Sequence, residues 1–271
     1  MSSLYDELAR LTAIPNAYEA WAAYRQAVTD FILTNTAPGG RLLLVGTGAC
    51  NDFDLRRLTG HAQITLLDRD EAAMRAGLQR QSIDPESVTV LCADLLGVSD
   101  EAYRAFADDM VNAARAHARG ERIDVTARFL SGMDAAMQER TPSPLTAQTE
   151  LCDSAVCIGV HSQLLVPFAR IAGVIARYAP LDTDRVLTQL RGYLPAAVGR
   201  VNDALFAWAK QTVLVGLETE RVGVAGGIDG AAQGMTDIRR FGRPEAETTL
   251  LWPFDPAQNK AYRMRLSAYR K

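Results

Sequence analysis

The sequence predicts a doubly wound α/β fold, in which helices cover both faces of a mostly parallel sheet. Short apolar runs, each bounded by turn residues, alternate with amphipathic stretches from residue 41 onward. A turn with two glycines follows the first run, as is typical of folds that bind a nucleotide at a strand end. The last two runs flank a proline-containing turn, which predicts an antiparallel pair that closes the sheet. With 271 residues, 48% of them hydrophobic, the chain is long enough to bury such a core.

Seven apolar runs are the candidate strands. Runs rich in Leu, Val and Ile with few charges suit parallel strands that are buried on both faces. Five are expected to be parallel: Arg41–Val45, Gln63–Asp68, Ser87–Ala93, Asp153–Val160 and the glycine-containing Arg221–Ala225. The runs Glu247–Trp252 and Tyr262–Tyr269 are expected to form a closing hairpin, with the last strand antiparallel to the others.

The intervals between the runs predict the helices and the helical additions. Asp70–Gln81 has acidic residues in its first turn and an arginine near its end, the charge order that a helix dipole favours. Tyr18–Leu33 repeats apolar residues at three- and four-residue spacing, so one of its sides should pack against the protein. Further helices are expected over Asp100–Arg119, over Ile123–Glu139 ahead of a break at Thr141–Pro144, and from Gln163 to about Glu218 with a kink near Pro195. We therefore expect one domain over residues 1–271, with a helical segment at 1–37 and helical insertions at about 98–150 and 163–218.

Composition and charge argue against several classes of protein. The net charge of −3 and the scattered arginines give no basic surface for nucleic acid. No apolar run approaches the roughly 18 residues that cross a bilayer, and the first residues lack a secretory signal pattern. The four cysteines form no CxxC pair and have no histidine at metal-binding spacing. These observations predict a cytoplasmic protein with reduced thiols, no metal site, no membrane contact and no nucleic-acid partner.

The residues that end the first three runs carry the functional signal. Gly46 and Gly48 follow the first run and allow the backbone to turn sharply and a ligand to approach it. Asp68 ends the second run, where nucleotide-binding folds place an acid that accepts the ribose hydroxyls. Asp94 ends the third run and should lie near an adenine, because ligands of such sheets bind beyond the strand C-termini.

These residues resemble the motifs of the class I S-adenosylmethionine (SAM)-dependent methyltransferase family, whose sheet has seven strands with the last one antiparallel. The resemblance covers about 38–97 by motif, and 153–162 and 247–271 by position. It implies a Rossmann-like methyltransferase fold, methyltransferase activity and SAM as the cofactor. In this resemblance Gly46 and Gly48 match the glycine-rich motif, Asp68 the ribose-binding acid and Asp94 the acid that faces adenine. The expected cofactor site comprises Gly46, Thr47, Gly48, Asn51, Asp52, Asp68, Arg69, Asp94, Leu95 and Gly159, with Tyr24 and Arg25 from the early helix.

Two departures from the family pattern concern the methionine end of the cofactor. Cys50 stands where a third glycine often occurs, and no acid precedes the first glycine. Asn51 and Asp52 could hold the cofactor's amino group, or cap a helix that begins near Asp52. Tyr24 and Arg25 could close over the cofactor's carboxylate, or pack beside the sheet.

Two other functions remain open on this sequence. An NAD(P)-dependent oxidoreductase would need a glycine where Asn51 stands, and Asp52 would be unwelcome beside its diphosphate. A catalytically silent SAM-binding module, acting as a regulatory or partner subunit, would share every cofactor residue with the enzyme.

The acceptor side is predicted from the residues after the fourth run. His161 alone of the three histidines lies at a strand C-terminus, and its pKa range suits a general base for O- or N-methylation. Otherwise His161 caps the next helix or bonds to the backbone. The glycine-rich stretch Ala225–Gly230 borders the acceptor pocket or is a plain turn. The helical insertions are expected to enclose a small-molecule acceptor, and a homodimer through Tyr18–Leu33 or the C-terminal hairpin stays open.

Overall fold

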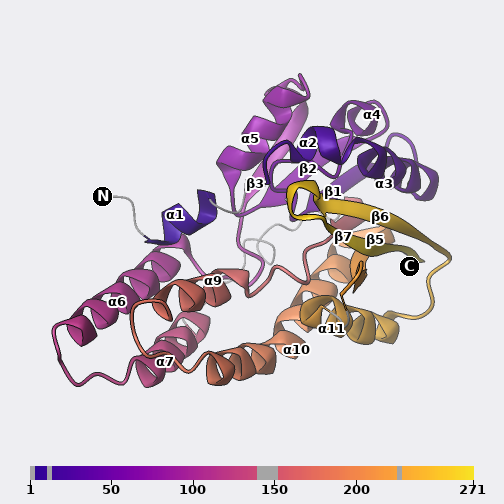
Figure 1. Ribbon diagram of the computed structural model, residues 1–271. Coiled ribbons are helices and arrows are strands. Elements are labelled where there is room, and N and C mark those ends of the chain that lie inside the picture. Colours follow the sequence, from indigo (N-terminus) through magenta and orange to yellow (C-terminus); the bar gives the residue numbers. More distant parts are fainter. Residues whose placement is uncertain (1–3, 11–13, 139–151, 225–227) are drawn as a thin grey trace.

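Seven strands form one sheet in the order β3-β2-β1-β4-β5-β7-β6 (Figure 1). The structure, a computed structural model, describes residues 4–10, 14–138, 152–224 and 228–271. Strands β1 to β5 are parallel, whereas β7 is antiparallel to β5 and to β6. This confirms the predicted mostly parallel seven-stranded sheet with an antiparallel last strand. The strands are β1 (Arg41–Val45), β2 (Gln63–Asp68), β3 (Val88–Cys92), β4 (Cys152–Ile158), β5 (Ala209–Arg221), β6 (Ala246–Asp255) and β7 (Lys260–Arg270).

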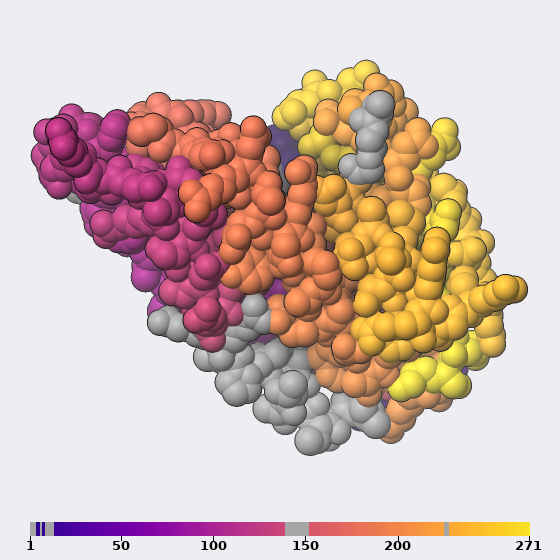
Figure 2. All heavy atoms as spheres, turned by 90° about the horizontal axis from the view of Figure 1, so that it is seen from below, coloured from indigo at the N-terminus to yellow at the C-terminus, as the bar shows by residue number. Residues whose placement is uncertain are grey.

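Alternate residues of the central strands face two separate cores. In β1, Leu42 and Leu44 belong to one core, and Leu43 and Val45 to the other. The first core packs against the helices at the top of Figure 1, namely α2 (Ala17–Ala20), α3 (Ala22–Asn35), α4 (Leu55–Thr59) and α5 (Glu71–Arg80). The second packs against α1 (Leu4–Arg10), α6 (Asp100–Ala118), α7 (Val125–Gln138), α9 (Val166–Ile175), α10 (Thr183–Trp208) and α11 (Asp229–Asp237). Figure 2 shows this second side, where α6 and α7 project beyond the sheet.

The central strand β5 occupies a stretch that the sequence predicted to be helical. The helical block expected over 163–218 ends at Trp208, and the strand expected at Arg221–Ala225 begins where β5 ends. Residues 212–218 are all buried, so β5 lacks the alternation of apolar and polar residues that marks a half-exposed strand. Residue 225, like the predicted break at Thr141–Pro144, lies outside the described residues.

The helix predicted at Tyr18–Leu33 is α2 followed by α3, with a break at Trp21. Its apolar side is buried, as predicted, and α3 packs against β6 and β7. The two surfaces considered for a homodimer thus contact each other within one chain. The block after β4 is α9 and α10 rather than one helix, and Pro195 lies inside α10. None of the helices in the described residues is long and apolar enough to span a membrane.

Gly77 of α5 packs against the loop after β1, and this contact predicts a stability effect. A Cβ at residue 77 would lie 2.6 Å from the Ala49 carbonyl oxygen. We predict that Gly77→Ala lowers the free energy of unfolding by about 1–3 kcal/mol, because backbone atoms must move apart. The matched control is Gly192→Ala, at an exposed position of α10 where a Cβ meets nothing within 4 Å. The control should gain roughly 0.5–1 kcal/mol from helix propensity. Urea denaturation measures both, and equal stability of the two variants would refute the contact.

Candidate functional site

A cavity of about 710 Å³ lies at the C-terminal edge of the parallel strands. Its size falls within the range of small-molecule sites. Most of the predicted cofactor residues line this cavity, namely Gly46, Thr47, Gly48, Asn51, Asp52, Asp68, Arg69, Asp94, Leu95 and Gly159. Tyr24, Arg25 and the predicted general base His161 are not among its lining residues. The other walls come from α1, α2, α5, α9 with the segment before it, and the β6–β7 hairpin. Within the described residues, no three His, Cys, Asp or Glu side chains gather as metal ligands.

The two glycines of the turn after β1 serve different purposes. Both have positive φ, 71° at Gly46 and 46° at Gly48, which favours glycine. A Cβ at Gly46 would lie 2.2 Å from Cγ2 of Val160, so this glycine is required by packing. A Cβ at Gly48 would meet nothing within 4 Å, so this part of the turn is open to the cavity. A ligand can therefore approach the backbone at Gly48.

Asp68 is fixed at the end of β2 by two backbone donors. The N–H of Gly48 donates to Oδ2 over 2.8 Å, and the N–H of Asp70 donates to Oδ1 over 3.0 Å. Burial raises the pKa of Asp68, although these N–H groups oppose the increase. Each carboxylate oxygen retains a second lone pair for a hydroxyl donor. The carboxylate is thus held ready to accept from a pair of hydroxyls.

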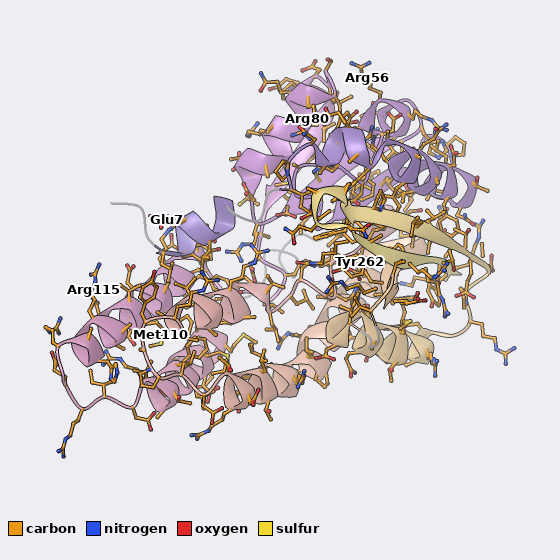
Figure 3. The ribbon with its side chains drawn as sticks, viewed as in Figure 1. Glu7, Arg56, Arg80, Met110, Arg115 and Tyr262 are labelled. Carbon is orange, nitrogen blue, oxygen red and sulfur yellow. The ribbon has the colours of Figure 1, made fainter. Side chains whose placement is uncertain are left out.

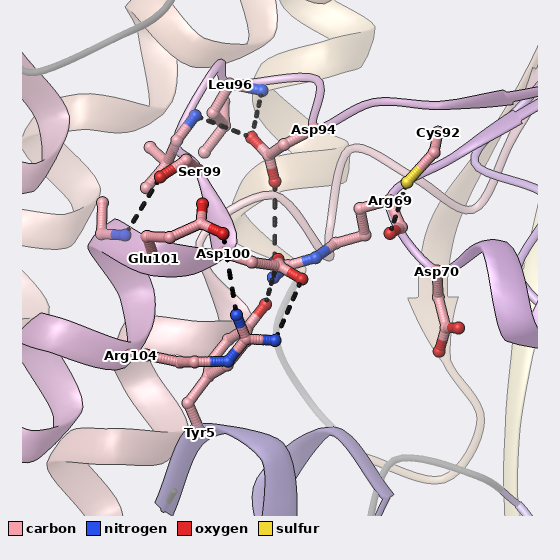
Figure 4. Close-up of polar contacts among 12 residues, drawn as sticks. Tyr5, Arg69, Asp70, Cys92, Asp94, Leu96, Ser99, Asp100, Glu101 and Arg104 are labelled. Atoms are coloured by element: carbon pink, nitrogen blue, oxygen red, sulfur yellow. Dashed lines mark hydrogen bonds and ion pairs between the residues drawn. The ribbon is translucent and has the colours of Figure 1, made fainter.

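Asp94 and Arg69 meet at the adjacent strand end (Figure 4). Oδ1 of Asp94 accepts from the N–H groups of Leu96 and Val98 over 2.8 and 3.2 Å, which fixes the loop after β3. Its Oδ2 lies 3.6 Å from Nη1 of Arg69, whose Nη2 donates to Asp100 over 2.9 Å. Burial raises the pKa of Asp94, and the charge of Arg69 opposes this. Oδ2 accepts from no backbone N–H in the described residues and is paired with Arg69.

The helix after the glycine turn begins later than the sequence predicted. It was expected near Asp52, but α4 begins at Leu55 and has five residues. Asp54 caps it, since its side chain accepts from the N–H of Arg57. The positive end of α4 is therefore already occupied by a carboxylate from the chain itself.

Asp52 lines the cavity beside a buried acid that the sequence did not indicate. Burial, followed by the charge of Glu218, raises the pKa of Asp52 to about 7, and Arg25 opposes the increase. Glu218 is on β5, is 2% exposed, and accepts a hydrogen bond of 2.6 Å from Ser162. Its other oxygen has no partner among the described residues. Since β5 was not predicted as a strand, Glu218 could not be placed at the sheet edge from sequence.

Tyr24 and Arg25 do not line the cavity; of the two alternatives, closure over the cofactor's carboxylate or packing beside the sheet, their contacts are those of packing. Arg25 donates to the carbonyl oxygens of Tyr18 and Asn51 over 2.5 and 3.4 Å, and so ties α2 to the loop after β1. Tyr24 is 3% exposed and stacks on Trp252 with ring centroids 5.7 Å apart. Both residues support the wall through packing and backbone contacts.

Arg80 is the arginine that lines this part of the cavity, and the sequence reasoning missed it. It lies between α5 and α2 (Figure 3) and donates to Oδ1 of Asn51 over 2.6 Å. The only sequence signal was an arginine in the last turn of a helix, which is more often explained by the helix dipole. The aromatic wall of Trp21, Trp252 and Phe254 was also missed, because it joins α2 to the hairpin.

His161 does not face the cavity, so its predicted role as general base is not supported by its position. The side chain is fully buried, and its Nε2 lies 2.8 Å from Oδ1 of Asn202 on α10. Asn202 in turn donates to Asp237 over 2.8 Å. A Cβ at Gly234 of α11 would lie 3.1 Å from the imidazole, so α11 covers the ring. Burial lowers the pKa of His161, which favours the neutral form.

This buried imidazole makes stability depend on pH. Because its pKa is lowered in the folded state, the unfolded chain binds the proton first as the pH falls below about 6.5. We predict that the wild-type protein loses stability relative to His161→Gln between pH 8 and pH 5. Urea denaturation at both values measures the difference in free energy of unfolding. If the difference in free energy of unfolding between the two proteins stayed constant with pH, the imidazole would have the same pKa in the folded and the unfolded chain, which would contradict this prediction.

Comparisons with known proteins reveal likeness of structure only. No protein-family model matches the sequence, and no curated protein matches it. The N-methyltransferase NodS from Bradyrhizobium japonicum WM9 is 14% identical over 95% of this chain and 98% of its own, with a TM-score of 0.47. Magnesium protoporphyrin IX methyltransferase (ChlM) from Synechocystis PCC 6803, with bound SAH, is 11% identical over 92% of this chain and 84% of its own, with a TM-score of 0.47. TrmN from Thermus thermophilus is 10% identical over 91% of this chain and 48% of its own, with a TM-score of 0.46. At these values the likeness carries no inference about substrate or activity.

Proposed function

We propose that this protein is a SAM-dependent methyltransferase that acts on a small molecule by O- or N-methylation. The observation that carries the proposal is the hydrogen bond from Gly48 to Asp68. It couples an open glycine turn to a buried carboxylate at the next strand end, the arrangement that binds a ribose beyond a parallel sheet. Asp94 extends the same edge toward the position expected for adenine.

The charges of the cavity suit a cofactor with a sulfonium and an amino group but no phosphate. Asp52, Asp68 and Asp94 all line it. A diphosphate would lie against these carboxylates, and Asp54 already caps the helix end that would otherwise bind it. These features support SAM over NAD(P).

Each part of the cofactor has a candidate partner on this chain. Asp68 would accept from the ribose hydroxyls, and Asp94 with Leu95 would contact the adenine. Asp52 would attract the cationic amino group, and Arg80 beside Asn51 would pair with the carboxylate. When bound, SAM supplies an activated methyl group, and the chain's task is to align the acceptor with it and to exclude water.

A small-molecule acceptor is supported by the walls of the remaining cavity. Helices α1 and α2 and the hairpin aromatics line it beyond the cofactor residues. A concave and largely apolar wall of this size suits a small molecule. All four cysteines are unpaired thiols, which suits the reducing conditions of the cytoplasm.

The silent SAM-binding module would use the same cofactor residues as the enzyme. Formation of S-adenosylhomocysteine (SAH) in the presence of an acceptor distinguishes the enzyme from this module.

Asp68 gives the first test of the cofactor site. We predict that SAH binds the wild-type protein and that Asp68→Asn weakens binding at least about tenfold, a loss of about 1.4 kcal/mol, because an amide cannot accept from both hydroxyls as a carboxylate does. Isothermal calorimetry measures the affinity. Asp108→Ala, at an exposed position of α6, is the control and should bind SAH as the wild type does. Stabilisation by NAD(P) in place of SAH would contradict the proposal.

Asp52 gives a second test through pH. Because its pKa is about 7, the carboxyl is mostly neutral at pH 5.5 and about half ionised at pH 7. An α-amino group stays largely charged over this range, since its pKa is about 7.7–8.0. We therefore predict that SAM affinity rises several-fold from pH 5.5 to pH 7 in the wild type and changes less in Asp52→Asn. Calorimetry at the two pH values measures the SAM affinity of both proteins. If the affinity changed equally with pH in the wild type and in Asp52→Asn, Asp52 would not belong to the cofactor site.

A further inference from the structure

Arg170 is an arginine that lines the cavity and has no acidic partner among the described residues. It lies on α9, and its Nη1 donates a 3.4 Å hydrogen bond to the carbonyl oxygen of Leu8 on α1. Burial lowers its pKa, and no carboxylate opposes that effect. Arginines on the surface differ, since Arg191 pairs with Asp229 and Arg263 with Glu220. Among the arginines that line the cavity, Arg69 is paired with two acids and Arg80 donates to the Asn51 amide, whereas the Arg170 guanidinium has the Leu8 carbonyl oxygen as its partner.

The wall around Arg170 is otherwise uncharged. It consists of side chains from α1, from the segment between β4 and α9, and from the first turn of α9: Tyr5, Leu8, Val160, Gln163, Leu164, Val166 and Pro167. The carboxylates Asp52, Asp68 and Asp94 lie at the C-terminal ends of β1, β2 and β3 or in the loops that follow these strands. The cavity thus has an acidic side and an apolar side that carries one positive charge.

The cofactor leaves Arg170 without a partner. The only carboxylate of SAM is assigned to Arg80, which lies on α5. Helices α5 and α9 cover opposite faces of the sheet (Figure 1). Neither the ribose nor the adenine carries a negative charge. The third arginine that lines the cavity, Arg69, is already paired with Asp94 and Asp100.

We propose that the methyl acceptor carries a carboxylate that pairs with Arg170, while its apolar part packs on the wall formed by α1 and α9. This rests on the proposed function, because it assigns that side of the cavity to the acceptor. Guanidinium binds a planar carboxylate through two parallel hydrogen bonds, which supplies both affinity and orientation. One unpaired guanidinium suits a singly charged carboxylate better than a phosphate, which would require a second free cation.

The test uses matched pairs of probes on the full chain saturated with SAH. Benzoate, phenylacetate and octanoate are each compared with the primary amide of the same skeleton, by calorimetry and thermal shift. At least one acid should bind ten times more tightly than its amide. The preference should disappear in Arg170→Gln and persist in Arg177→Gln, an exposed arginine beyond the end of α9 that does not line the cavity.

Two outcomes overturn the inference: no acid binds the wild type better than its amide, or Arg170→Gln keeps the preference. SAH affinity separates this failure from failure of the proposed function. Arg170→Gln should bind SAH as tightly as the wild type, which also shows that the variant is folded. Absence of SAH binding by the wild type would instead remove the cofactor assignment.

Discussion

The hydrogen bond between the Gly48 N–H and the Asp68 carboxylate is the interaction on which the site depends. It joins the turn after β1 to the end of β2, two strands already in parallel register. The turn can take this path only because glycine at 46 avoids Val160 and glycine at 77 avoids the backbone of Ala49. Packing on both faces of the sheet therefore fixes the position of one carboxylate. A ligand that uses Asp68 finds it already oriented, with little further ordering to be done.

Burial raises the pKa of four acids at this edge, namely Asp52, Asp68, Asp94 and Glu218. Ionising these groups in the folded protein therefore costs stability as the pH rises, because the unfolded chain gives up their protons more readily. A bound cation would lower that cost by stabilising the charged forms. The negative charges on the acidic side of the cavity thus lack a counter-charge without a ligand and gain one when a cationic ligand binds. For Arg170, whose pKa is lowered by burial, a bound anion would stabilise the charged form in the same way.

The sequence was informative where function follows from local order along the chain. Residues at the ends of successive parallel strands must meet at one edge, so the order of the strands alone brings Gly46, Asp68 and Asp94 together. It was uninformative where two distant elements decide the outcome. His161 does follow β4, but α10 and α11 cover it, and neither packing could be read from its neighbours in sequence. β5 was missed because a strand buried on both faces shows no period-two pattern, and Glu218 was missed with it.

The two helical insertions do not contribute equally to the lining of the cavity. The sequence suggested that both insertions would enclose the substrate, yet only α9 among their described helices lines the cavity. Helices α6 and α10 instead pack against α9, so they hold it in place from behind. α1 contacts both α6 and α9, and Tyr5 of α1 bonds to Asp100, which also binds Arg69. The position of Arg170 is therefore supported by α6 and α10, which do not line the cavity, and by α1, which does. Under the role proposed for Arg170, a change of acceptor means altering α1 and α9 while leaving α6 and α10 unchanged.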